Sequence, residues 1–126
     1  MSNLPFDIHV LRHANLYHHA DLTKATLHAT KFSRTCGDVC HAGIWLKHAE
    51  PHMIGFRMEA CLFAQASAGI LLDHPIVDLK NLWERPFVNF NLEDFDERYA
   101  VLKNHPTRLQ CINLPIETLR LAMHEK

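Results

Sequence analysis

The chain has 126 residues, of which 48% are hydrophobic and 21% charged, a composition typical of one globular domain over residues 1–126. Thirteen basic and fourteen acidic residues leave a formal net charge of −1, which offers no electrostatic attraction to nucleic acid or an anionic membrane. No apolar run approaches the ~20 residues of a membrane span. The first residues lack a basic leader followed by an apolar stretch. We therefore expect a cytoplasmic protein whose four cysteines are reduced thiols or metal ligands.

The first half of the chain predicts one helix followed by three strands. Residues 6–19 carry apolar side chains at a loosely helical spacing, which indicates an amphipathic N-terminal helix. Three runs of alternating side chains follow, at 23–33, 38–48 and 52–60. In the third run Ile54, Phe56 and Met58 share one face, as in a strand with one buried side. The three runs predict an antiparallel meander, with a short connection of residues 49–51 between its last two strands.

The second half of the chain predicts helices. Residues 61–72 are rich in Ala and Leu and contain no proline, which indicates a largely buried helix. Three further helices are expected, at 77–84, 91–104 and 114–123. The last of them would have Pro115 close to its first turn. Strands followed by helices predict an α+β fold, in which the helices pack on one face of a three-stranded antiparallel sheet.

Three of the four cysteines fall at the ends of predicted elements, where functional groups are often held by a scaffold. Cys36 lies in the loop before the second strand, Cys61 between the third strand and the long helix, and Cys111 just before the last helix. The positive end of a helix dipole favours thiolate at Cys61 and Cys111, and thiolate binds metal and attacks sulfur. Together the three cysteines would suit Zn²⁺ or an iron–sulfur cluster, with Asp38 as an oxygen ligand. Spacing alone favours a simpler interpretation, in which free cysteines are small buried hydrophobic residues.

The cysteines stand in recognisable motifs. These are Cys36-Gly37-Asp38, Cys61 opening a helix that contains Ala66-Ser67-Ala68, and Arg108 three positions before Cys111. In this pattern the chain resembles the NifU/IscU-type iron–sulfur cluster assembly scaffolds, over about residues 23–123. The approach to the last cysteine, NHPTRLQC, is closer to SufU-like members. The chain departs from the family at Glu59-Ala60, where a glycine usually precedes the second cysteine, and at Gln110, where IscU members have a histidine.

The resemblance implies an IscU/NifU N-terminal-like fold and a scaffold or carrier rather than an enzyme. It implies that Cys36, Cys61 and Cys111 hold a transient 2Fe–2S cluster, or Zn²⁺ in its absence, with Asp38 as a labile fourth ligand. A carboxylate among thiolates suits a cluster that is passed on, because soft metals hold oxygen more weakly than sulfur. The implied partners are a cysteine desulfurase, which would deliver persulfide sulfur to one of the three thiols, and recipient apo iron–sulfur proteins.

Two functions that use the same residues stay open beside a third that uses none of them. The first is the cluster scaffold, and the second is a zinc-bound persulfide acceptor that stimulates a cysteine desulfurase and has sulfurtransferase-like activity. The third is a small α+β interaction module whose thiols bind no metal. The sequence also leaves open whether the chain is a monomer or a weak dimer.

Four further residues lie near the proposed site in the sequence. His41 and His105 could each supply an alternative ligand, but a surface position or a hydrogen bond to one of the ligands is the favoured interpretation. Arg108 could stabilise thiolate or persulfide charge near Cys111, and an exposed arginine explains it equally well. Cys40 lies outside the family pattern. It could be a spare sulfur acceptor if it points the same way as Asp38, but a core residue in line with its strand is the preferred interpretation.

Overall fold

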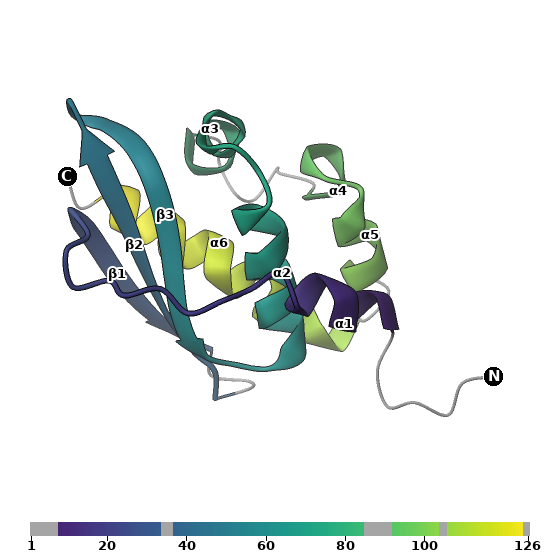
Figure 1. Ribbon diagram of the computed structural model, residues 1–126. Helices are drawn as coiled ribbons and strands as arrows, with labels where there is room; N and C mark the ends of the chain where they lie inside the picture. Colours follow the sequence, from purple (N-terminus) through teal and green to yellow (C-terminus); the bar gives the residue numbers. More distant parts are fainter. Residues whose placement is uncertain (1–7, 34–36, 85–91, 104–105, 125–126) are drawn as a thin grey trace.

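The computed structural model describes residues 8–33, 37–84, 92–103 and 106–124. Its elements follow in the order α1 (Ile8–Ala14), β1 (Leu27–Phe32), β2 (Val39–Lys47), β3 (Glu50–Glu59), α2 (Leu62–Leu72), α3 (Ile76–Glu84), α4 (Leu92–Phe95), α5 (Arg98–Lys103), the 3₁₀ turn η2 (Pro106–Arg108) and α6 (Leu109–Met123). The strands form one antiparallel sheet in the order β1-β2-β3, and α6 lies against β1 and β2 (Figure 1). The predicted α+β class, with an N-terminal helix and a three-stranded sheet, is confirmed. Among the described residues no helix is long and apolar enough to cross a membrane.

The covered face of the sheet is built from the alternating residues that predicted the strands. In the β2–β3 ladder Cys40 pairs with Met58, and Ala42 pairs with Phe56. Ala29 of β1 pairs with Ala42 from the other side. All five of these side chains are buried. Because the small side chains of β1 and β2 leave room above them, α6 can approach this part of the sheet closely.

The turn between β2 and β3 is shorter than the sequence predicted. Only His48 and Ala49 connect the strands, and Lys47 already pairs with Glu50. Both turn residues have positive φ, 55° and 67°, the pattern of a two-residue hairpin turn whose twist matches that of the strands. The predicted connection at 49–51 was therefore wrong by two residues, because Glu50 and Pro51 already belong to β3.

The segment between α1 and β1 protects the outer edge of β3. The Ala20 N–H donates to the Phe56 carbonyl at 2.9 Å, and the Met58 N–H donates to the Tyr17 hydroxyl at 3.0 Å. This segment passes in front of the sheet in Figure 1 before it enters β1. The predicted helix over 6–19 was thus too long at its C-terminal end, and the first strand begins later than 23. Pairing with an exposed strand edge outweighs the weak helical spacing of the segment.

Small side chains on α2 allow neighbouring elements to pack closely against it. Its buried positions include Ala64, Ala66, Ser67, Ala68 and Gly69. A Cβ atom at Gly69 would collide with the carbonyl oxygen of His13 at the end of α1. The α1–α2 contact therefore needs a glycine at this position for steric reasons.

One long helix was predicted over 91–104, but two short ones are present. The Asp96 carboxylate accepts a hydrogen bond from the Arg98 N–H at 2.8 Å, as an N-cap does at the start of a helix. Capping by Asp96 therefore ends α4 and starts α5. Because an aspartate can either cap a helix or lie inside its first turn, the acidic pattern alone could not show the break.

Asp96 is also the centre of an ionic network that ties α2, α3 and α5 together. Its carboxylate accepts hydrogen bonds from the Arg98 guanidinium at 2.7 Å and is 2.6 Å from His74 Nε2. His74 Nδ1 lies 3.2 Å from Asp78, and Arg98 also reaches Asp73 at 2.8 Å. Burial by itself would raise the pKa of Asp96, but the hydrogen bonds from Arg98 and His74 outweigh it and hold the pKa well below its ordinary value.

We predict that Asp96→Asn lowers the free energy of unfolding by about 3 kcal/mol at pH 7, because the Asp96 side chain is only 8% exposed and Arg98 would lose the less exposed of its two carboxylate partners. A depressed folded-state pKa stabilises the protein fully above about pH 5, and the stabilisation is lost as pH falls through the folded-state pKa. The difference in free energy of unfolding between Asp96→Asn and the original protein should therefore shrink below about pH 4, as measured by urea titration.

The matched control is Asp94→Asn, which removes an exposed carboxylate from the neighbouring helix α4. This substitution should change the free energy of unfolding by less than about 0.5 kcal/mol both at pH 7 and below about pH 4. Equal effects of the two substitutions would show that the network adds no more stability than an ordinary surface charge.

Candidate metal centre

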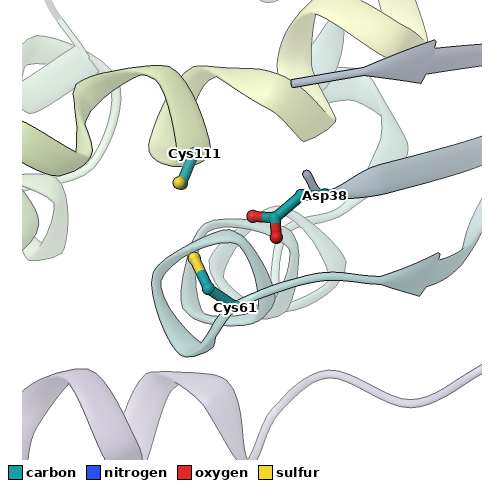
Figure 2. A group of neighbouring side chains, drawn as sticks. All are labelled: Asp38, Cys61 and Cys111. Carbon is teal, nitrogen blue, oxygen red and sulfur yellow. The ribbon is translucent and has the colours of Figure 1, made fainter. Parts of the chain in front are cut away.

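Asp38, Cys61 and Cys111 converge from three separate elements. Asp38 immediately precedes β2, Cys61 is the N-cap of α2, and Cys111 lies in the first turn of α6. Their carboxylate and thiol ligand atoms all lie within 4.8 Å of one another. Figure 2 shows the three side chains pointing into one space between α6 and the start of α2. Two of the predicted cysteines and the predicted aspartate are therefore brought together.

The position of Cys111 differs from the sequence prediction. The final helix begins at Leu109 rather than near Leu114, so Cys111 lies inside it and Pro115 is an interior residue. Proline has no N–H, so Pro115 cannot make the usual helical hydrogen bond to the Cys111 carbonyl four residues earlier. The prediction placed the proline near the helix start because such a residue is usually excluded from helix interiors. Packing of α6 against the sheet and α2 outweighs that preference here.

Asp38 is a buried carboxylate whose hydrogen-bonding capacity is not filled by the described residues. It is only 6% exposed, and its Oδ2 atom has no hydrogen-bond partner among them. A buried carboxylate oxygen without a partner is costly, whereas a bound cation would satisfy it. The orphaned oxygen and the two thiols form a donor set that suits a thiophilic cation such as Zn²⁺ or iron.

The thiol of Cys61 is not activated in the way its place at a helix start suggested. Burial raises the pKa of Cys61, and the nearby Asp38 carboxylate raises it further. The Ala64 N–H in the first turn of α2 and the Cys111 thiol act in the opposite direction, but they do not compensate. In the metal-free protein the helix dipole therefore does not suffice to favour thiolate at Cys61, and a bound cation would supply the missing positive charge.

The backbone before β2 is arranged so that Asp38 faces the two helices. Ser33 N–H donates to the Asp38 carbonyl, and Gly37 N–H donates to the Ser33 carbonyl, both at 2.8 Å. Gly37 has a φ of 69°, in the left-handed region that glycine adopts without strain. The Cys-Gly-Asp motif thus has a conformational reason for its glycine.

The remaining predicted residues have different outcomes. Cys36 and His105 lie outside the described residues, so their roles stay predictions. His41 lies on the outer face of the sheet, where its Nδ1 atom is 2.8 Å from the Thr30 hydroxyl, and the structure does not bring it to the other three. Arg108 is exposed, with its guanidinium 5.6 Å from the ring centroid of Phe63, two residues after Cys61.

Cys40 is a core residue, as its strand pattern indicated. Its side chain is fully buried on the covered face of β2. Burial raises the pKa of its thiol to about 12, and the neighbouring Thr118 side chain acts in the opposite direction without compensating. Such a thiol stays protonated at neutral pH, which argues against a role as a spare sulfur acceptor.

Ser33 is a residue that the sequence did not single out. It is 6% exposed, and its hydroxyl, like Asp38 Oδ2, has no hydrogen-bond partner among the described residues. It lines a hollow of about 420 Å³ between the end of β1 and α6, across which Lys31 and Glu117 form an ion pair of 2.6 Å. No local signal distinguishes this serine from the others, because its burial depends on where α6 lies.

We predict that Gly37→Ala lowers the free energy of unfolding by about 1 kcal/mol, since a Cβ disfavours positive φ. Steric collision should contribute little, because a Cβ at this position would meet no atom within 4 Å. Gly37→Asn is the matched control, as asparagine tolerates this conformation better, and it should cost less in the same urea titration. If both variants unfold like the original protein, the turn does not need its glycine.

A scan against protein-family profiles and a search of curated proteins gave no match to the chain. Solved structures do match its fold. The N-terminal part of a NifU-like protein from Brucella abortus superimposes with a TM-score of 0.72 at 13% identity, over 94% of this chain and 92% of that one. A candidate iron–sulfur cluster assembly scaffold of the SUF system from Fervidobacterium islandicum AW-1 gives 0.71 at 18% identity, over 94% and 96%.

A third solved structure, of a hypothetical protein, matches with a TM-score of 0.64 at 17% identity, over 93% of this chain and 97% of its own. All three likenesses extend over nearly the whole of both chains. The fold shared with the NifU-like and SUF-system proteins supports the resemblance carried by the cysteine motifs. The chain therefore has the fold of the NifU/SufU-type proteins.

Proposed function

We propose that this protein is a scaffold that assembles an iron–sulfur cluster and passes it to apo-proteins. The observation that carries the proposal is the convergence of Asp38, Cys61 and Cys111 within 4.8 Å of one another. Cys36, two residues before Asp38 in the chain, is proposed as the third cysteine ligand. The likeness of the fold to a NifU-like protein and a SUF-system scaffold supports this choice over an interaction module without metal.

The composition of the donor set fits a transient cargo. Thiolates from Cys36, Cys61 and Cys111 would hold iron strongly, whereas the Asp38 carboxylate is a harder and weaker ligand for it. One weak ligand allows exchange with a ligand from the recipient protein. The cluster would then leave without all three cysteines having to release it at once.

A cysteine desulfurase is the proposed sulfur donor, and both proteins are proposed to act in the cytoplasm. Cys61 is partly exposed, whereas Cys111 is fully buried, so Cys61 is the more accessible acceptor of these two. Its thiolate would attack the outer sulfur of the donor's persulfide, forming a persulfide on Cys61 and releasing the donor's cysteine as thiolate. The proton of the Cys61 thiol has to leave before this attack, which binding of a cation beside it would favour.

A zinc-bound sulfur acceptor is the second candidate, and the compactness of the site favours it. Zn–S bonds of about 2.3 Å place the ligand atoms of a tetrahedral ion about 3.8 Å apart. The three described ligand atoms, all within 4.8 Å of one another, need only small movements to reach that spacing. A 2Fe–2S cluster needs four ligands arranged in two pairs, so it requires Cys36 as the fourth ligand beside the three described ones.

The deciding experiment is anaerobic reconstitution. The purified protein is incubated with iron, cysteine and a cysteine desulfurase, and bound metal and acid-labile sulfide are measured. We expect iron and sulfide to rise together in the original protein and to be lost in Cys61→Ser and Cys111→Ser. Cys40→Ala is the matched control, because it removes a cysteine from the core and should keep both.

Stoichiometric zinc that iron cannot displace, with persulfide on one cysteine and no sulfide, would support the sulfur acceptor instead. Equal loss of metal in Cys40→Ala and Cys61→Ser would contradict a site built on Cys61. Binding of neither metal by the original protein would leave the fold without its proposed chemistry.

We further predict that Asp38→Cys binds its metal more tightly and releases it more slowly, since a fourth thiolate replaces the weak oxygen ligand. Transfer of the bound metal or cluster to a chelator or apo-protein should slow by about tenfold, on the scale of a 1.4 kcal/mol change in barrier. Asp38→Asn tests the charge alone and should weaken binding. Transfer by Asp38→Cys at the original rate would show that the carboxylate does not control release.

A further inference from the structure

Two of the proposed ligands belong to helices that lie far apart in the sequence but pack together in space. Cys61 caps the start of α2, and Cys111 lies in the first turn of α6. A hydrogen bond from the Gln65 N–H to the Cys61 carbonyl, at 3.1 Å, makes Cys61 part of the first turn of its helix. The spacing of the two thiols therefore follows the position of α2 relative to the beginning of α6.

The beginning of α6 lacks one of the hydrogen bonds that normally stiffen a helix. Pro115 has no N–H to donate to the carbonyl of Cys111, and its ring crowds that carbonyl. The first turn of α6 therefore depends more than usual on contacts outside the helix. The turn affected is the one that carries Cys111.

Ser67 supplies such a contact directly beside Cys111. Its hydroxyl donates a hydrogen bond of 2.6 Å to the carbonyl of Ile112, the residue that follows Cys111. Ser67 is fully buried and lies on α2, the same helix that Cys61 caps. This buried hydrogen bond thus joins α6, which carries Cys111, to α2, which Cys61 caps.

Tyr99 of α5 holds Ser67 in this position. The Tyr99 hydroxyl donates to the Ser67 carbonyl at 3.0 Å and lies 3.3 Å from the Ser67 hydroxyl. Tyr99 is also fully buried. Because these polar groups lie in the core, where an unpaired group is costly, the arrangement of α2, α5 and α6 around Ser67 is strongly specified.

We infer that Ser67 is a positioning residue of the metal centre: its hydrogen bond to the Ile112 carbonyl fixes α2 against the first turn of α6 and so sets the spacing between Cys61 and Cys111. This inference rests on the proposed function. Ser67 contacts neither metal nor sulfur in this role, and it acts through the positions of the two helices.

Titration with Co²⁺ alone tests the inference, because thiolate-to-cobalt charge-transfer and d–d bands report both affinity and geometry. Ser67→Ala should weaken Co²⁺ binding by about tenfold, the lower end of the effect of groups that orient metal ligands. Its d–d bands should also shift. Tyr99→Phe should weaken binding less, since Ser67 keeps its hydroxyl. Circular dichroism verifies that each variant is folded at the temperature of the titration.

Thr118→Val is the matched control. The Thr118 hydroxyl is fully buried and donates a hydrogen bond of 2.7 Å to the Leu114 carbonyl, but both groups belong to α6. Its removal should destabilise the fold without changing the cobalt affinity more than about twofold, since no contact between α2 and α6 is lost. This control separates a loss of stability from a loss of positioning.

Equal weakening by Ser67→Ala and Thr118→Val, or unchanged affinity and bands in Ser67→Ala, would overturn the role of Ser67. Cys61→Ser distinguishes this failure from a failure of the proposed centre. If Cys61→Ser removes one thiolate's share of the charge-transfer band while Ser67→Ala changes nothing, only the positioning role fails. If Cys61→Ser leaves the cobalt spectrum unchanged, the centre itself is refuted, and the role of Ser67 with it.

Discussion

The packing of α6 between the sheet and α2 is the contact on which the rest of the structure depends. It brings Cys111, near the C-terminal end of the chain, against residues that lie just before β2 and α2. The contact is close because β1 and β2 present small side chains and because α2 is rich in alanine. Larger residues on either surface would move α6 outward and separate the thiols, since packed interiors leave little room for adjustment.

That packing also creates an electrostatic problem at the candidate metal centre. It buries a carboxylate and two thiols within 4.8 Å of one another, and the described residues leave one carboxylate oxygen without a partner. Burial and the nearby carboxylate raise the pKa of Cys61, which favours its protonated form. A bound cation would resolve both difficulties at once, because it would satisfy the carboxylate and favour thiolate. In the proposed function, metal binding would therefore also stabilise this region.

The network around Asp96 shows how the same protein treats a buried carboxylate with a structural role. Asp96 accepts hydrogen bonds from Arg98 and is bonded to His74, and its negative charge is compensated within the fold. Asp38 differs in that its Oδ2 atom lacks such a partner among the described residues. The contrast between a satisfied carboxylate and an unsatisfied one, in the same small fold, is what marks Asp38 as a candidate ligand rather than a structural acid.

Local patterns in the sequence were sufficient for the sheet and for the long helix after it. Period-two alternation with one apolar face identifies β2 and β3 within two residues at each end, because the pleat of a strand imposes that period on whatever side is buried. The site followed from the family resemblance carried by the Cys-Gly-Asp motif rather than from spacing, and the structure does place Asp38 and Cys61 close together. The core position of Cys40 also followed from strand parity alone.

Other features depended on contacts between distant parts of the chain. The start of α6 could not be read from its sequence, because Pro115 is tolerated inside the helix only through packing against the sheet and α2. The chain breaks between α4 and α5 because the Asp96 carboxylate caps the start of α5 and pairs with the Arg98 guanidinium. The pKa of Cys61 was misjudged for a related reason, since the helix start was visible in the sequence and the burial was not. The sequence by itself determined which residues could be strands and ligands, whereas burial and the separation of the thiols were decided by the tertiary structure, because both depend on how elements far apart in the chain pack together.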